Sequence, residues 1–453
     1  PSPAAAVRAA SVGSQVQKDG RQMFDKNELR LMHQEVFTTA IRKYQEQLAK
    51  NTGPSASEAL NLSECTLKPN PRLVQVYVRK RPLSPEEKQK DFDVMAVPAG
   101  SPLPSRLLLH RCLFQADLRT PVINHLNFEF DAVFNDQVQD HEVYRVSVHH
   151  LVTSSKEGGA STVLMFGQTG SGKTHSMSAI QRFAAKDLFE GLHGGMALSV
   201  VEVRAGRCFE LLGEASGKEL RIREGSAGSY VAEGASELFP QGPEDLCRAL
   251  KEAQSRRATS ATEANEESSR SHAICTIRLL QTGGTLTLAD CAGTERRKDQ
   301  AHHSREHQKE GAEINASLHA LKECVRFLSM GQRIPSHAYR TSALTKLLAG
   351  SFSRVNAASL AVFCTVAPGA TDTEHSLATL QTAAGLRATS VREEKEVLSG
   401  ASQPREPHPK NWSPEQVRTW LSSIEDGRFA EVCTGLPIDF TGQMFVRLTE
   451  ARF

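Results

Sequence analysis

The sequence predicts an α/β protein in which helices cover both faces of a central, mostly parallel β-sheet. The first observation is a series of apolar, strand-like segments with helix-like segments between them, an order typical of such sheets. The second is a glycine-rich octapeptide that directly follows one strand and matches G-x-x-x-x-G-K-[ST]. The third is a charged, proline-containing stretch at residues 391–410, after which a small all-α segment is expected.

The predicted strands are mostly apolar, as expected for strands buried on both faces. They are residues 72–79, 162–166, 197–203, 273–280, 285–289 and 359–366.

The remaining organisation follows from composition and periodicity. Residues 1–20 are rich in Ala, Ser and Gly and are expected to be disordered. Within residues 21–70, apolar side chains recur every three or four positions from Asp25 onward, which predicts one amphipathic helix followed by a linker. The globular core is therefore expected over residues 71–390, with a linker at 391–410 and a separate segment at 411–453.

Composition excludes several classes of protein. The chain has 453 residues, 39% hydrophobic and 23% charged, enough for a normal core and two or three domains. Its formal net charge of +2 gives no overall signal for nucleic acid or membrane binding. No apolar stretch approaches the ~20 residues that cross a bilayer. The nine cysteines are scattered without a C-x-x-C pair, which indicates free thiols in a reducing compartment rather than disulfides or a zinc site.

The glycine-rich octapeptide is the strongest functional motif. Glycines let main-chain N–H groups close around a β-phosphate, because a side chain would block the approach. The lysine would place its charge on the β- and γ-phosphates, and the last hydroxyl would ligate Mg²⁺. The preceding strand disfavours the alternative of a chance glycine-rich turn. The motif consists of Gly167, Gln168, Thr169, Gly170, Ser171, Gly172, Lys173 and Thr174.

Two further segments fit a nucleotide site. Asp290 ends the strand at 285–289, and a carboxylate at that position can hold a Mg²⁺-bound water. Gly293 follows it and can bring its N–H to a γ-phosphate without steric conflict. Residues 265–272 form a polar, hydroxyl-rich segment that alone would be an ordinary loop. Beside the other two motifs, we interpret it as a γ-phosphate sensor.

In this order, the three segments resemble the P-loop, switch I (N-x-x-S-S-R-S-H, residues 265–272) and switch II (D-x-A-G-x-E, residues 290–295) of kinesins. R-K-R-P at 79–82 is similar to the adenine-binding motif R-x-R-P of that family. Further matches are F-D-A-V-F at 130–134, G-A-E-I-N at 311–315 and E-H-S-L at 374–377. The resemblance implies the kinesin motor fold of P-loop NTPases, microtubule-stimulated ATP hydrolysis with Mg²⁺, and a cytoplasmic location on the microtubule cytoskeleton.

The resemblance also implies roles for single residues. In the Mg²⁺ shell, Ser269 would join Thr174 and Asp290. Arg270 and Glu295 would form a salt bridge between the switches that closes when ATP is bound. The adenine would be held by Arg79, Arg81 and Pro82, with His175 against its other face. The salt bridge would help to position the attacking water, with Ser268 nearby, while the N–H of Gly293 would meet the γ-phosphate.

Residues 318–326 resemble the α4 helix of kinesin-13, the subfamily that depolymerises microtubules. Lys322, Glu323 and Cys324 match its lysine-glutamate-cysteine triplet, and the N-terminal helix resembles its neck more loosely. Without the family match, a solvated helix face with one buried thiol would explain the triplet. The tubulin contacts that the resemblance implies are Asp117, Lys322, Glu323, Cys324, Arg326, Arg340 and Lys346.

The chain departs from the subfamily at several positions that would face tubulin. Gln115 and Ala116 stand where kinesin-13 has lysine and valine, and only Asp117 of that triplet remains. Ala343 and Gly350 stand where kinesins usually have Lys and Asp. Losing a surface cation near an acidic partner lowers the on-rate and the salt-sensitive part of the affinity. We therefore expect weak tubulin binding.

The segment at 411–453 resembles the first two-thirds of a SAM domain, a module that usually mediates protein association. Ser413 is a good helix N-cap, and Pro414 suits the first helical position. The apolar residues that fit the spacing of such a domain are Phe429, Leu436, Phe440 and Leu448. An unrelated helical tail is the alternative.

Three functions remain open at this stage. The first is an ATPase that bends tubulin at microtubule ends and depolymerises them. The second is a scaffold that binds microtubules weakly and is localised by its SAM-like tail. The third is a stepping kinesin, which is disfavoured because no neck linker or heptad stalk follows Thr389.

Overall fold

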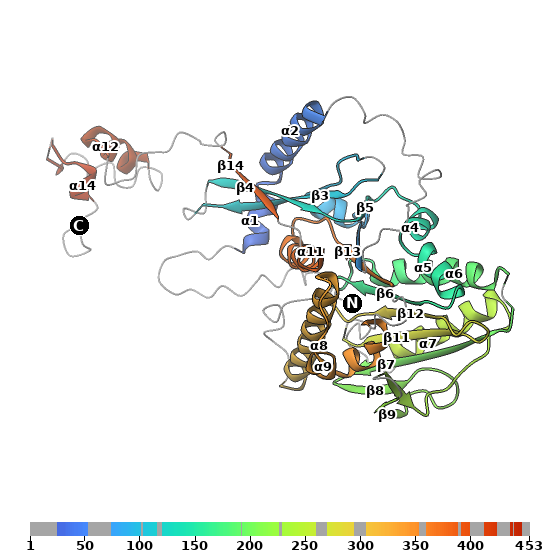
Figure 1. Cartoon of the computed structure of the whole chain (residues 1–453). Helices are drawn as coiled ribbons and strands as arrows, with labels where there is room; N and C mark the ends of the chain where they lie inside the picture. Colours follow the sequence, from blue (N-terminus) through green and yellow to red (C-terminus); the bar gives the residue numbers. More distant parts are fainter. Residues whose placement is uncertain are drawn as a thin grey trace, which may run out of the picture. The chain divides into compact units, whose positions relative to one another are not determined.

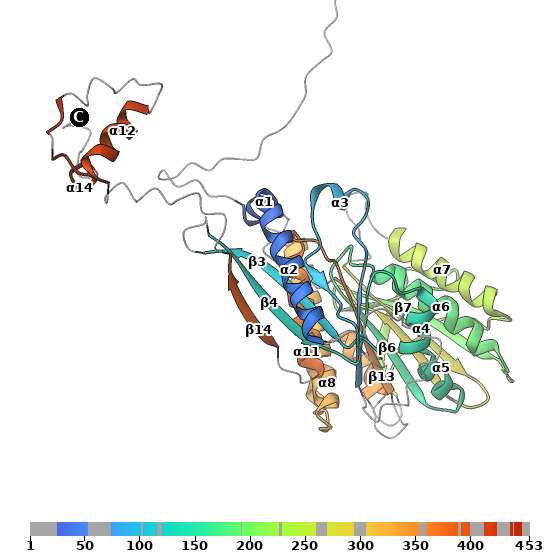
Figure 2. The same cartoon turned by 90° about the horizontal axis from the view of Figure 1, so that it is seen from above.

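The computed structural model of the chain is shown in Figures 1 and 2. It describes residues 25–52, 74–100, 103–115, 120–191, 193–225, 229–259, 270–293, 305–352, 359–387, 391–398, 412–423, 435–437 and 439–445. Contacts divide the chain into one unit of residues 1–113 and 121–396 and another of residues 114–120 and 397–453.

A ten-stranded sheet forms the centre of the first unit, and all the predicted strands belong to it. Its order is β10 (Tyr230–Glu233), β9 (Glu219–Glu224), β8 (Arg207–Glu210), β7 (Met196–Arg204), β11 (His272–Leu279), β12 (Thr285–Asp290), β6 (Ala160–Phe166), β13 (Ser359–Val366), β1 (Val74–Lys80) and β5 (Ala132–Phe134).

The prediction of a mostly parallel sheet is wrong for one half of it. The strands from β12 to β5 pair in parallel, whereas those from β10 to β12 pair antiparallel. The turn between β7 and β8 shows why: Ala205 (φ 48°) and Gly206 (φ 72°) are both left-handed. A tight turn of this kind joins antiparallel neighbours, whereas parallel strands need a long crossover.

Helices cover both faces of the large sheet, as predicted (Figures 1 and 2). On one side lie α4 (Asp140–Ser147), α5 (His149–Lys156), α6 (Lys173–Phe189) and α7 (Pro243–Thr259). On the other lie α8 (Arg305–Ser329), α9 (Ser336–Arg340), α10 (Ala343–Leu347), the 3₁₀ turn η5 (Ala349–Phe352) and α11 (Thr373–Arg387). The core between them includes the stacked rings of Tyr77, Phe134 and Phe363.

A second, four-stranded sheet was not predicted. Its order is β14 (Arg392–Val397), β4 (Pro121–Glu129), β3 (Arg106–Phe114) and β2 (Met95–Ala96). The linker predicted at 391–410 is therefore wrong over β14. This strand is almost entirely polar, so composition does not reveal it. Remote side chains hold it: Asn124 donates to Glu393 at 2.6 Å and the Tyr44 hydroxyl donates to Glu394 at 2.9 Å.

The N-terminal helix begins as predicted but is broken. The Asp25 carboxylate accepts a hydrogen bond from the N–H of Asn27 at 2.7 Å and caps α1 (Lys26–Met32). His33 ends that helix, and α2 (Gln34–Thr52) follows. The apolar spacing continues across the break, with Leu29 and Phe37 both buried, so periodicity alone does not show it.

The C-terminal unit holds α12 (Pro414–Ser423) and α14 (Gly442–Phe445). Ser413 caps α12 as predicted, because its hydroxyl accepts from the N–H of Gln416 at 3.3 Å. A small apolar cluster is formed by Trp412, Val417, Leu421 and Phe440. Phe429 and Leu448 lie outside the described residues. None of the described helices is long and apolar enough to cross a membrane.

Candidate active site

The glycine-rich loop joins the end of β6 to the start of α6 and packs against β13. Gly167, Gly170 and Gly172 have φ values of 149°, 74° and 97°, which residues with a Cβ rarely adopt. A Cβ at Gly167 would lie 2.5 Å from the Thr365 hydroxyl and 2.6 Å from the Thr365 carbonyl oxygen. The loop can therefore approach the sheet this closely only with glycine at 167.

Two polar side chains of the loop, Lys173 and Ser171, are held by the loop's own main chain. The Lys173 ammonium donates to the carbonyl oxygens of Gly167 and Gln168, both at 2.9 Å, and is 7% exposed. The Ser171 hydroxyl donates to the Gln168 carbonyl at 2.7 Å. The loop thus places one buried positive charge among its main-chain groups, the arrangement that a phosphate chain requires.

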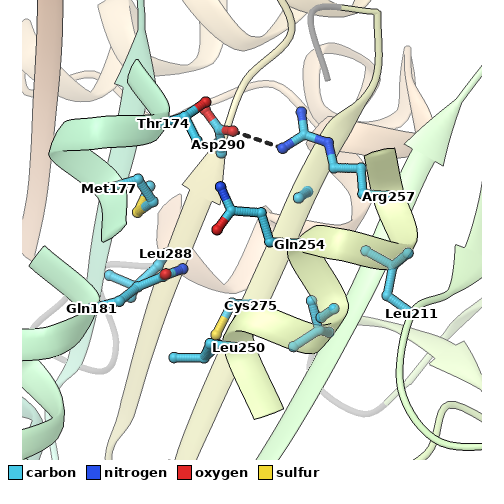
Figure 3. Close-up of a pocket in the computed structure, with 13 residues that line it drawn as sticks. Thr174, Met177, Gln181, Leu211, Leu250, Gln254, Arg257, Cys275, Leu288 and Asp290 are labelled. Carbon is cyan, nitrogen blue, oxygen red and sulfur yellow. Dashed lines mark hydrogen bonds and ion pairs between the residues drawn. The ribbon is translucent and has the colours of Figure 1, made fainter. Parts of the chain in front are cut away.

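Thr174 and Asp290 face the same pocket, which lies between α6, α7 and the sheet (Figure 3). Asp290 Oδ2 accepts from Arg257 at 2.6 Å, whereas its buried Oδ1 has no hydrogen-bond partner among the described residues. A free carboxylate oxygen beside a threonine hydroxyl fits a Mg²⁺ ion bound partly through water. Ser269, the third predicted ligand, lies outside the described residues.

Arg257 is a residue that sequence reasoning missed. It extends from α7 and is 4% exposed. Besides Asp290, it donates to the Ser271 hydroxyl at 3.1 Å and to the Ser271 carbonyl at 2.6 Å. It thereby connects α7, the end of the switch I segment and the strand end of β12. Its neighbour Arg256, which pairs with Glu252 at the surface, has the same residue type, so the sequence gives no signal to separate them.

His272 connects both switch segments to α8. Its Nδ1 accepts from the N–H of Ala292 at 3.0 Å, and its Nε2 donates to the Ser317 hydroxyl at 2.8 Å. Ser317 in turn donates to the Ile314 carbonyl at 2.8 Å. Burial, with a smaller effect of the nearby Arg257 charge, lowers the pKa of His272 to about 3, so the ring is neutral at physiological pH.

The predicted adenine-binding arginines are both held by carboxylates. Arg79 donates to Asp140 at 2.6 Å and to the Ser176 hydroxyl at 3.2 Å. Arg81 forms a bidentate pair with Glu87 of α3 (Glu87–Lys90), at 2.5 and 2.6 Å, and donates to the Gly170 carbonyl at 2.7 Å. The Arg81 hydrogen bonds lower the pKa of Glu87 to about 2.

The other side of the adenine site is more open. His175 is 68% exposed, and its Nε2 lies 3.9 Å from Asp140. Pro82 is also exposed. The structure therefore brings Arg79, Arg81 and His175 together around the start of α6 and adds Asp140, for which the sequence offers no signal.

The predicted switch residues are described only in part. Arg270 lies just before β11 and Gly293 lies just after β12, where Gly293 is buried. Ser268, Glu295 and the loop residue Asp117 lie outside the described residues. The predicted salt bridge between Arg270 and Glu295 stays a prediction.

The residues predicted to contact tubulin differ in how much of their surface is exposed. Arg326 and Arg340 are exposed, and Lys346 and Glu323 are partly exposed. Cys324 has no exposed surface, so in this conformation its thiol packs in the core and offers nothing to a partner. Lys322 is half-buried, and burial lowers its pKa. The buried Cys324 does not face a partner in this conformation, whereas the tubulin contact of the half-buried Lys322 stays a prediction.

Acidification should destabilise the protein through His272. In the unfolded chain the ring takes up a proton near pH 6.5, whereas in the native state it does so only near pH 3. Between these values the unfolded state binds the extra proton, so the free energy of unfolding falls as the pH falls, by up to about 1.4 kcal/mol per pH unit. Urea unfolding of wild type and His272→Asn at several pH values would check this. Equal pH slopes would contradict it.

The chain is similar in sequence to kinesin motor domains. The kinesin motor domain model matches residues 79–389. Diatom spindle kinesin-1 of Cylindrotheca fusiformis is 33% identical over 354 residues, which cover 75% of this chain and 53% of that protein. The chain therefore spans about half the length of this curated relative.

Two solved structures of KIF14 are also similar. The KIF14 dimer in its two-heads-bound state, with AMP-PNP in complex with a microtubule, has a TM-score of 0.57 at 27% identity over 70% of this chain and 94% of that one. KIF14 with ADP in complex with a microtubule has a TM-score of 0.58 at 28% identity over 69% of this chain and 94% of that one. Because the family model covers more than half of the sequence, the chain belongs to the kinesin motor family.

Proposed function

We propose that the chain is an ATP-hydrolysing microtubule motor of the kinesin-13 type, which destabilises microtubule ends. The observation that carries the ATPase assignment is the joint placement of the Lys173 ammonium, the Thr174 hydroxyl and the free Oδ1 of Asp290 around one loop. The related KIF14 structures contain AMP-PNP or ADP and a microtubule, which supports the same nucleotide class and partner for this chain.

The chain's own residues supply binding and positioning. Lys173 offsets phosphate charge, and the glycines bring main-chain N–H groups to the phosphates. Thr174 and Asp290 would hold Mg²⁺, with Ser269 as a further ligand, and that ion neutralises charge on the β- and γ-phosphates when it is bound. Arg79, Arg81, Pro82 and His175 would orient the base. We expect Arg270 and Glu295 to close over ATP and, with Ser268 and Gly293, to place the attacking water.

The kinesin-13 assignment has a narrower basis. It rests on the Lys322, Glu323 and Cys324 triplet in α8 and on the N-terminal helices, which pack on the small sheet. The names of the related spindle kinesin and KIF14 do not indicate this subfamily. Exposed charges on α8, α9 and α10 would meet acidic tubulin, with Arg326, Arg340 and Lys346 as the main cations.

A scaffold is the second candidate function. It is favoured by the absence of cations at Gln115, Ala116 and Ala343, since Ala343 is buried and presents no charge beside Lys346. In that case the SAM-like tail would localise a weakly binding module. A stepping kinesin is the third candidate.

ATP turnover should depend on Lys173. Lys173→Ala removes the charge partner of the phosphates and should abolish hydrolysis, measured as phosphate release with tubulin present. Lys186→Ala is the matched control, because Lys186 is exposed on the same helix. Undiminished turnover in Lys173→Ala would refute the nucleotide-site assignment.

Microtubule shortening should depend on the Lys322 and Glu323 charges of α8, both of which are partly exposed. Lys322→Met with Glu323→Gln removes both charges with little change in volume and should stop the shortening of stabilised microtubules in ATP at low salt. The control is Arg248→Met with Asp245→Asn, an exposed ion pair on α7, across the sheet.

The salt dependence of shortening gives a second check. Exposed contacts are screened by salt, so added salt should weaken the effect steeply. If stabilised microtubules keep their length at saturating wild-type protein, the depolymerase function is wrong and the scaffold takes its place.

A further inference from the structure

A buried arginine outside the matched motor domain contacts the segment that supports the phosphate-binding loop. Arg30 of α1 is 1% exposed, and burying a guanidinium is costly unless its donors are satisfied. Its Nη1 and Nη2 donate to Glu374 at 2.8 and 2.5 Å, a bidentate geometry. Its Nε donates to the Cys112 carbonyl at 3.0 Å, and Nη1 also donates to the Ala370 carbonyl at 3.1 Å.

The contacted segment, residues 370–374, forms the start of α11 and the turn before it. Arg30 binds both of its ends, at Ala370 and Glu374. The Asp91 carboxylate holds the same turn from another direction, because it accepts from the N–H of Ala370 at 3.0 Å and from the Thr371 hydroxyl at 2.6 Å. Two buried charged groups of opposite sign therefore fix the main chain of this short segment.

Asp372 lies in the middle of the segment and reaches the phosphate-binding loop. Its Oδ1 accepts from Gln168 Nε2 at 2.8 Å, and Gln168 is 4% exposed. The carbonyl oxygen of Gln168 accepts from Lys173 and from Ser171, at 2.9 and 2.7 Å. Direct contacts thus run from Arg30 through residues 370–374 to the ammonium that is expected to bind phosphate.

We propose that Arg30 is a positioning residue for the nucleotide site: it holds residues 370–374 so that Asp372 fixes Gln168 and the phosphate-binding loop. The proposal rests on the proposed binding of ATP at that loop. It makes the N-terminal helix part of the working nucleotide site, although α1 lies outside the residues that the family model matches.

The alternative is that Arg30 only stabilises the fold. In that case its removal would lower the melting temperature but would leave the affinity of the folded protein for nucleotide unchanged. A positioning residue would also weaken nucleotide binding, and its effect would not add to that of Asp372, because both act through one contact.

The test measures the dissociation constant of a fluorescent ADP together with the melting temperature. The variants are Arg30→Met, Asp372→Ala, which removes the acceptor of the Gln168 side chain, and the double variant; Arg30→Lys keeps the charge but loses the bidentate geometry. Arg42→Met, an exposed arginine on α2, is the matched control. We expect each single variant to weaken ADP binding about five- to tenfold. The double variant should be no weaker than the weaker single variant.

The outcomes separate the two ideas. If Arg30→Met does not fold, Arg30→Lys and Glu374→Gln carry the same expectation of weaker ADP binding. A dissociation constant within about twofold of wild type in the folded variants would overturn the positioning role. No ADP binding by wild type would overturn the proposed function as well, whereas normal binding by wild type and every variant would overturn the positioning role alone.

Discussion

The close approach of the phosphate-binding loop to β13 is the constraint on which the rest of the site depends. Gly167 lies against both the hydroxyl and the carbonyl of Thr365, and the Ser171 hydroxyl lies 2.7 Å from the same threonine hydroxyl. β13 pairs in parallel with both β6, which leads into the loop, and β1, which ends near Arg79. In the second pairing Arg79 lies opposite Thr365, the residue that Gly167 contacts. The residues proposed to contact the phosphates and the base are therefore positioned by one set of parallel strands.

The opposite side of the nucleotide site uses polar contacts in place of close packing. Arg257 and His272 are both buried, and each connects elements that are distant in the sequence. Arg257 connects α7 to β12 and to Ser271, and His272 connects Ala292 to Ser317 of α8. A buried hydrogen-bonded network is rigid when every member is paired and costly when a partner is lost. Such a network favours discrete arrangements, which suits segments that change state when a γ-phosphate is bound or lost.

Elements that depend on local sequence pattern could be predicted, whereas elements and site residues that depend on contacts with distant side chains could not. The buried strands and the glycine-rich loop carry their own signals, and they are present in the structure. The antiparallel half of the sheet follows from short turns such as that at Ala205, which apolar runs do not reveal. β14 pairs with β4, and Asn124 and Tyr44 bind its carboxylates. Arg257, Asp140 and Asp372 enter the site only through folding, since their residue types are common along the chain.

The Arg257–Asp290 pair shows that the site is not optimised for stability alone. A buried carboxylate with both oxygens paired would be more stable, because an unpaired buried polar atom costs about 1–3 kcal/mol. Here Arg257 takes one oxygen, and the other has no partner among the described residues. Arg257 also donates to the hydroxyl and the carbonyl oxygen of Ser271, so one guanidinium binds both Asp290 and the end of the switch I segment. Asp290 and the end of the switch I segment are therefore coupled through one buried side chain, and a movement of Ser271 would act on the guanidinium that Asp290 pairs with.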